Sequence, residues 1–221
     1  MSSLLTLRQN LRQEMRVDPS GRVQADTLLN RNLNQAIAQI QQDGDYNWGF
    51  NDADYSTSTV VGQAAYTLPS DFVRIEAGTI KYNEYQLMPV DYRWLKGTNQ
   101  TLAVNGSPSY YYLRNNNLNL FQRPDAINAL EMSYRKQLAI MASDSDDSGL
   151  PLVFNEAIVL YAAYLCWNDF SGKEDKAITS FQSYNETMKG LFAQYLGSRD
   201  ESNFNMAFET TSDYSSTPFY N

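Results

Sequence analysis

The strongest constraint on the fold is a segment in the last third of the chain that is apolar on every side. All eleven residues from 157 to 167 are apolar, and the polar side chains of 152–169 lie near its two ends. A helix that is apolar all round is buried in a core, and this run is too short to cross a bilayer. The segment therefore predicts a central buried helix that other elements must surround.

Two helices are predicted in the first fifty residues, because apolar side chains recur there at intervals of three and four. The first covers about 4–15, and the second runs from an N-cap at Asp26 or Thr27 to Asp43. The second helix also has a face of amides that is either solvated or bound to a protein partner. These amides are Asn30, Asn32, Asn34, Gln35, Gln39 and Gln41.

The carboxy-terminal part adds a long helix over 173–196, whose apolar stripe includes either Ile178 or Phe181. Between the central region of the chain and the buried helix, the Asp- and Ser-rich segment 142–149 is typical of an exposed linker. We expect Asp144, Asp146 and Asp147 to face a wet surface.

The middle of the chain, from Thr57 to about Leu138, has the composition of an antiparallel sheet or small barrel. Short runs of Val, Ile, Tyr and Thr are cut there by Gly, Pro and Asn. Residues 115–117 are all Asn and predict a hairpin, and 91–95 predict a short helical turn. The predicted strands cover 59–66, 72–82, 86–89, 109–114, 118–122 and 129–136.

These elements predict an α+β fold. We expect a helical bundle made by the amino- and carboxy-terminal helices, an inserted antiparallel β-rich domain, and an extended carboxy-terminal tail. The corresponding boundaries are 1–50 for the first helices of the body, 51–140 for the insertion, 141–197 for the helices that complete the body, and 198–221 for the tail.

The distribution of charge limits the partners. The formal net charge is -8, and residues 1–140 sum to zero, whereas 141–197 contribute -5 and 198–221 contribute -3. Tight binding to nucleic acid without regard to sequence needs a basic surface, so this balance argues against it. With no run of eighteen apolar residues and no secretion signal, we expect no membrane contact.

The absence of histidine and the single cysteine, Cys166, exclude most catalytic and metal-binding arrangements. No glycine-rich phosphate loop occurs. The acidic run from Asp144 resembles a calcium loop poorly, because Asn155 stands where the bidentate glutamate belongs and Pro151 interrupts it. We therefore expect no enzyme activity, no catalytic residues, no cofactor and no metal.

The last 24 residues are polar and acidic, and they carry five aromatic rings. Such a tail cannot bury a core of its own. It is either a disordered terminus or a segment that docks on a neighbouring protein through aromatic anchors. The candidate partner-binding residues are Phe204, Phe208, Tyr214, Phe219 and Tyr220.

The order of elements, together with several short motifs, resembles the adaptor proteins that join the portal to the tail in tailed bacteriophages. Residues 62–72 (GQAAYTLPSDF) are similar to the family's entry into its sheet. Residues 106–113 and 118–125 are similar to the hairpin that follows, and 150–162 to the start of the buried helix. The matches span about 29–195, and their order carries the resemblance. A similar order occurs in connectors of short-tailed phages, so the tail type stays open.

The resemblance implies a structural virion protein in the virion neck, made in the host cytoplasm. Such adaptors form closed rings, usually twelvefold, on the portal after DNA packaging, and they extend its channel toward a tail or tail-completion protein. Packaged DNA would pass without specific binding, repelled by an acidic lumen to which Asp144, Asp146 and Asp147 could contribute. The tail aromatics would bind the portal or an adjacent copy. The alternative is a β-domain receptor- or carbohydrate-binding module of a phage tail, with the tyrosines as its binding face.

Overall fold

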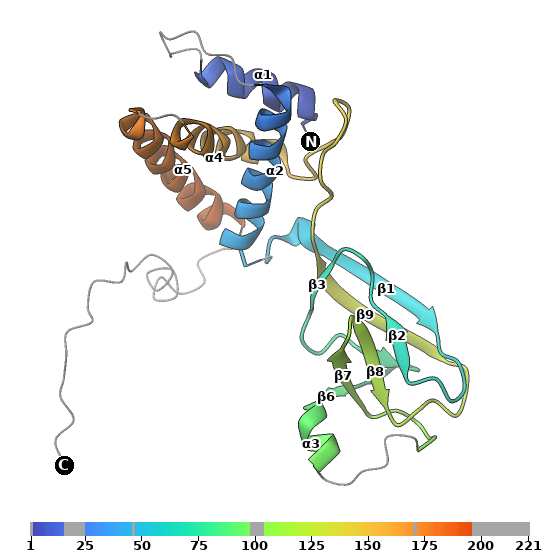
Figure 1. Cartoon of the computed structure of the whole chain (residues 1–221). Helices are drawn as coiled ribbons and strands as arrows, with labels where there is room; N and C mark the ends of the chain where they lie inside the picture. The colour runs from blue at the N-terminus through green and yellow to red at the C-terminus, as the bar shows by residue number, and fades with distance from the viewer. Residues whose placement is uncertain (1, 16–24, 46, 98–103, 170–171, 196–221) are drawn as a thin grey trace, which may run out of the picture.

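The computed structural model describes residues 2–15, 25–45, 47–97, 104–169 and 172–195. Four helices gather at one end of the molecule, and the strands with one short helix gather at the other (Figure 1). The predicted α+β class is confirmed. Two hydrophobic cores correspond to these two parts, one built from residues 4–48 and 141–192 and the other from residues 66–134.

The helical body consists of α1 (Leu4–Met15), α2 (Asp26–Asp43), α4 (Asn155–Asn168) and α5 (Glu174–Tyr195). Helix α4, which follows the short 3-10 helix η2 (Leu152–Phe154), packs against α1, α2 and α5. Its alanines are fully buried, so neighbouring helices can approach it closely, and the predicted buried helix is confirmed. One detail at α2 was wrong, because Ala25 occupies the N-cap position and Asp26 lies in the first turn.

The β lobe, residues 52–136, contains two sheets. In the first, the long strand β9 (Ala129–Lys136) pairs along one edge with β1 (Asp52–Ser58). Its other edge pairs with β3 (Phe72–Ile75) and β4 (Lys81–Tyr82), and β4 in turn pairs with β5 (Tyr85–Gln86). All of these pairings are antiparallel.

The second sheet has the order β2 (Ala65–Thr67), β8 (Asn117–Phe121), β7 (Tyr110–Arg114) and β6 (Met88–Pro89). Only its β6–β7 pairing is parallel among the described strands, and α3 (Tyr92–Gly97) follows β6. The predicted hairpin is confirmed, since Asn115 and Asn116 take φ values of 52° and 57° between β7 and β8. Side chains from both sheets meet in the second core.

Three strand predictions were wrong. Strand β1 begins at Asp52 and was missed because five of its seven residues are polar and none is fully buried, which leaves only Ala53 and Tyr55 as an apolar signal. The strand predicted over 59–66 is mainly a turn, and only 65–67 pairs. The one predicted over 72–82 is divided by a turn in which Gly78 has φ 79°.

The chain crosses between the helical body and the β lobe twice, and an aromatic cluster lies beside the first crossing. The indole of Trp48 is completely buried, stacks on Phe192 with centroids 5.1 Å apart, and meets Phe154 edge-on at 5.1 Å. Its Nε1 donates to the carbonyl of Ile40 at 2.9 Å. A Cβ on Gly44 would lie 2.0 Å from that same Nε1, so this ring fits only above a glycine.

The second crossing, 137–141, is held by the amide face of α2. Asn34 donates to the carbonyl of Met141 and accepts from its N–H, both at 2.9 Å. Gln41 accepts from the N–H of Leu138 at 3.4 Å and donates to Asn51 at 3.0 Å. Part of the amide face therefore contacts the chain itself, which neither of the two alternatives for this face anticipated.

We expect Gly44→Ala to lower the free energy of unfolding by about 1–3 kcal/mol, because the new methyl group collides with the indole of Trp48. The matched control is Gly190→Ala in α5, where a Cβ meets nothing within 4 Å. This control should raise the free energy of unfolding by about 0.5–1 kcal/mol through helix propensity. Urea denaturation measures both, and equal effects would contradict the packing described for Trp48.

We expect Asn34→Ala to destabilise the fold by about 1–3 kcal/mol, since it leaves both backbone groups of Met141 without a partner. Gln35→Ala, on the exposed side of the same helix, should change stability by less than about 0.5 kcal/mol. Thermal unfolding of the two variants beside the unaltered protein tests the difference. Helix propensity cannot explain a loss, because Ala is the best helix former, and a loss of the same size in both variants would contradict the role assigned to the Asn34 contacts.

Candidate interaction surfaces

The acidic segment 142–149 packs as a cap on the first helix. The N–H of Leu4 donates to the carbonyl of Asp146 at 2.9 Å, and the N–H of Leu5 donates to that of Asp144 at 3.2 Å. The first N–H groups of a helix have no partner within the helix, and the positive end of its dipole favours nearby carboxylates. The segment thus supplies both the acceptors and the negative charge that the start of α1 requires.

The three carboxylates of this segment have different surroundings. Asp144 accepts from Nη2 of Arg8 at 2.9 Å, and the guanidinium of Arg8 is almost fully buried. The carboxylate of Asp146 accepts from the Ser143 hydroxyl and from the N–H groups of Ser143 and Ala142. Asp147 forms an isolated β-bridge with Ser3. Asp144 and Asp147 are exposed, and Asp146 is half-buried.

These hydrogen bonds, led by the one from the Ser143 hydroxyl, lower the pKa of Asp146. A carboxyl whose pKa is lower in the folded state stabilises the fold above its unfolded pKa, about 3.9, and loses that contribution as the pH falls through the folded pKa. Its contribution is therefore complete at neutral pH and disappears in acid.

We expect Asp146→Asn to lower the melting temperature at pH 7, and the difference from the unaltered protein to shrink as the pH falls below about 4. Asp147→Asn is the matched control, since among the described hydrogen bonds the Asp147 carboxylate accepts none from residues 142–143. Melting curves between neutral pH and about pH 2 follow both. A deficit for Asp146→Asn that stays constant across this range would rule out ionisation as its cause.

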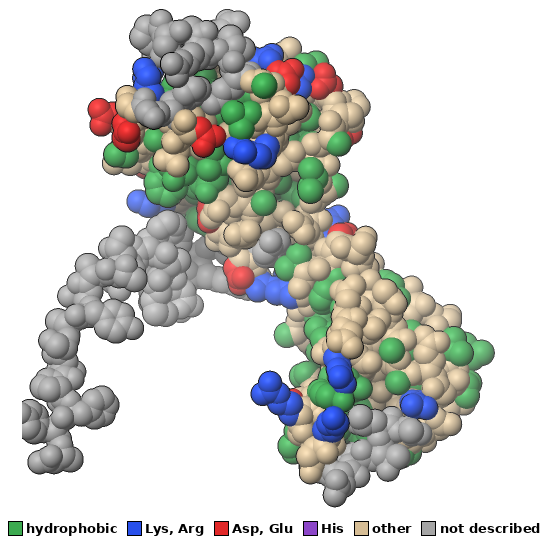
Figure 2. Space-filling view, viewed as in Figure 1, with side chains coloured by type: hydrophobic (Ala, Val, Ile, Leu, Met, Phe, Trp, Pro, Cys, Tyr) green, Lys and Arg blue, Asp and Glu red, His purple; other side chains and the backbone are tan. Residues whose placement is uncertain are grey.

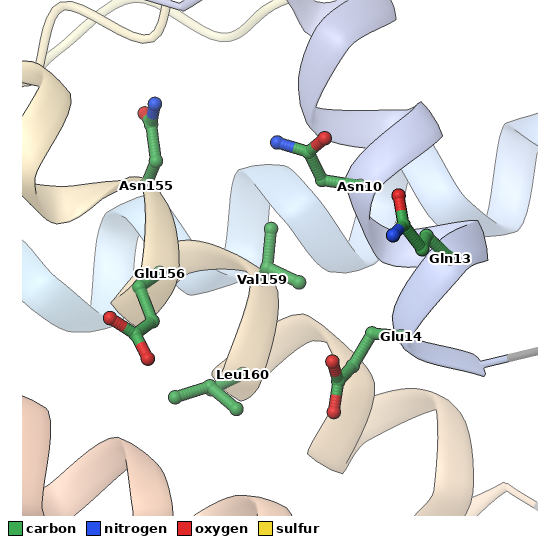
Figure 3. A pocket seen from close by; sticks show the side chains of 7 residues that line it. All are labelled: Asn10, Gln13, Glu14, Asn155, Glu156, Val159 and Leu160. Carbon is green, nitrogen blue, oxygen red and sulfur yellow. The ribbon is translucent and has the colours of Figure 1, made fainter. Parts of the chain in front are cut away.

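A shallow hollow of about 340 Å³ lies between α1 and α4 (Figure 3). Amides, two carboxylates and two aliphatic side chains surround it, namely Asn10, Gln13, Glu14, Asn155, Glu156, Val159 and Leu160. Among its lining residues there is no cation to stabilise a developing negative charge. Within the described ranges, no three His, Cys, Asp or Glu side chains are placed to hold a metal ion.

Cys166 is a core residue. Its side chain is fully buried in α4, and Nδ2 of Asn32 lies 3.1 Å from Sγ. Burial raises the pKa of the thiol to about 11, so at neutral pH the nucleophilic thiolate is scarcely formed.

The outer side of α5 carries exposed apolar and aromatic groups beside half-buried rings of α4. Phe181 and Ile178 are 39% and 55% exposed, although one of them was expected in the buried stripe. The stripe that faces the core is formed by Ala177, Tyr184, Met188, Leu191 and Phe192. The ring of Phe181 lies 5.0 Å from that of Tyr164, which makes a continuous aromatic surface. Exposed apolar surface of this kind is typical of protein–protein contacts.

The tyrosines of β7 alternate between the two faces of its sheet. Tyr111 points into the core, whereas Tyr110 and Tyr112 lie on the opposite face and are more exposed. Tyr112 contacts the ring of Tyr92 and Tyr110 contacts that of Phe121, with centroids 5.2 and 6.5 Å apart. Much of this aromatic surface is used in packing within the lobe.

The candidate tail residues, Phe204, Phe208, Tyr214, Phe219 and Tyr220, lie outside the described residues. Among the described residues, no helix has the length and apolar character that crossing a membrane requires. A family model for the SU10 adaptor protein matches residues 2–209. No curated protein matches the chain.

Proposed function

The chain belongs to the SU10 adaptor protein family of bacteriophages, and we propose that copies of it form a closed ring that joins the portal to the tail. In this role the ring continues the DNA channel after packaging. The observation that carries the proposal is the family match, which covers residues 2–209 and so includes both the helical body and the β lobe. The implied partners are other copies of the chain, usually twelve in all, the portal, and a tail or tail-completion protein.

A closed ring of identical copies repeats one interface between two different patches of the chain. The surface made by exposed Ile178 and Phe181 on α5 with the half-buried ring of Tyr164 on α4 is suited to one side of such an interface. An adaptor acts through its surfaces, and this aromatic surface is one that such a role would use.

The acidic segment would face the channel. Asp144 and Asp147 are exposed, and residues 141–197 carry a net charge of -5. Like charges repeated around a ring repel the phosphates of DNA, so the DNA passes without specific binding. Arg8 offsets only one of these carboxylates through its ion pair with Asp144.

The tail would attach the ring to its neighbours. Phe204, Phe208, Tyr214, Phe219 and Tyr220 would bind the portal or an adjacent copy, because aromatic side chains dominate the energetics of many protein interfaces. A segment that orders only on binding meets its entropic cost at that moment, so attachment would follow the arrival of the correct partner.

We expect a chain that ends at residue 197 to fold, with circular dichroism like that of the full chain, and to be lost from assembled particles. Tyr85→Ser serves as the control, because this ring is 74% exposed on the β lobe and its loss should leave incorporation unchanged. Incorporation is measured by the amount of the chain in purified particles and by electron microscopy of the particle neck. Normal incorporation of the truncated chain would refute the role of the tail, and a neck without a ring of this chain would refute the whole proposal.

A further inference from the structure

The β lobe is neutral as a whole, but its charges are unevenly placed. Residues 88–123 contain four basic side chains and one acidic side chain, Asp91. Figure 2 shows Lys and Arg side chains gathered on the part of the lobe that carries α3, away from the helical body. We call this surface the distal basic patch; it consists of Tyr92, Arg93, Lys96, Tyr112, Arg114 and Arg123.

Aromatic rings and cations alternate in this patch. The guanidinium of Arg114 lies 4.2 Å from the centroid of the Tyr92 ring, which in turn lies 5.2 Å from the ring of Tyr112. Burial raises the pKa of Tyr112, and the charges of Arg114 and Arg123 oppose that rise, so both cations lie near its hydroxyl. Stacked Arg and Tyr side chains present a flat cationic surface that suits carboxylates and aromatic rings.

The four cations of the patch differ from most other described arginines, which form ion pairs. Within the described parts of the chain, ion pairs are formed by Arg8, Arg12, Arg31, Arg74 and Arg135. None of the four patch cations takes part in one. The carboxylate of Asp91 accepts from the backbone N–H of Arg93 at 2.6 Å, at the start of α3. Arg93, Lys96 and Arg114 are exposed, and Arg123 is half-buried.

Negative charges and aromatic rings that complement the distal basic patch occur in the same chain. Residues 198–221 hold four carboxylates and one arginine, for a net charge of -3, together with five aromatic rings. The 26 residues that follow Tyr195 can extend over about 85 Å. The ring of Tyr195 is 6.3 Å from that of Trp48, at the base of the β lobe, whereas the distal basic patch lies toward its far end.

We propose that the distal basic patch of one copy binds residues 198–221 of a second copy. The proposal rests on the proposed function, in which copies stand side by side. Two complementary surfaces at different places on one chain are what a ring of identical copies needs. Each exposed charge pair contributes little, so one tail binds weakly and the association falls as salt rises. In a ring, every copy contributes one tail and binds the tail of a neighbour, so many weak contacts together hold the ring.

The test is a charge exchange between two full-length variants. The first carries Arg93→Glu, Lys96→Glu and Arg114→Glu, and the second carries Asp200→Lys, Glu201→Lys, Glu209→Lys and Asp213→Lys. Each variant alone presents a patch and a tail of like charge. In an equimolar mixture, each patch meets a tail of opposite charge on the other variant. Sedimentation velocity measures association, and circular dichroism checks that both variants fold.

Tryptophan fluorescence gives a second readout at the patch itself. Trp94, in α3, is 58% exposed, whereas Trp48 and Trp167 are buried. Association should shift the emission of Trp94 to shorter wavelength, and about 0.5 M salt should reverse the shift. Lys189→Glu, an exposed charge reversal on α5, outside the patch, is the control for a single reversal and should behave as the unaltered protein.

We expect each charge-reversed variant to associate at least about tenfold more weakly than the unaltered protein. The mixture should recover to within about threefold. Failure of the mixture to recover, or a Trp94 shift that does not depend on protein concentration, would overturn binding between copies. A short DNA duplex tests the other possibility. If the unaltered protein and the tail variant bind it and the Arg93→Glu, Lys96→Glu, Arg114→Glu variant does not, the patch is a nucleic-acid site instead. If that variant still forms rings in particles, this inference fails while the proposed function stands.

Discussion

The structure depends on the burial of α4 between helices that come from both ends of the chain. A helix with eleven consecutive apolar residues needs cover from several neighbours, and here α1 and α2 come from the start of the chain while α5 comes from its end. The residues between them must therefore leave the helical layer and return to it. These intervening residues form the β lobe, and both of its connections lie on the same side of the helices (Figure 1).

Those two connections are fixed by different means. The first is fixed by shape, because the buried indole of Trp48 fills the space above Gly44. The second is fixed by hydrogen bonds, because Asn34 pairs with both backbone groups of Met141 as a neighbouring strand would. Arg74 of β3 adds a link across the junction, where its Nη1 donates to both carboxylate oxygens of Asp45 at 3.0 Å. An insertion held at both of its ends is suited to carry a surface at a defined distance from the helices.

The sequence could predict the elements that carry a clear period, and it could not predict contacts between distant segments. The apolar run of α4 and the paired asparagines of the β7–β8 hairpin have a direct local signal. Strand β1 has only a weak one, because all of its side chains except those of Ala53 and Tyr55 are polar, and it pairs with β9, more than seventy residues later. The amide face of α2 was ambiguous, since Asn34 contacts a segment 107 residues away. The cations of the distal basic patch are likewise scattered over three elements and meet only in the folded lobe.

The capping of α1 also sets an order of events during synthesis. Every strand pair of the β lobe joins residues between 52 and 136, so the lobe has all of its pairing partners before α4 leaves the ribosome. The first helix, although it is made first, must wait beyond that point, because the carbonyls that receive its leading N–H groups belong to Asp144 and Asp146, and because it packs on α4. The earliest residues to be translated are therefore among the last to reach their final place.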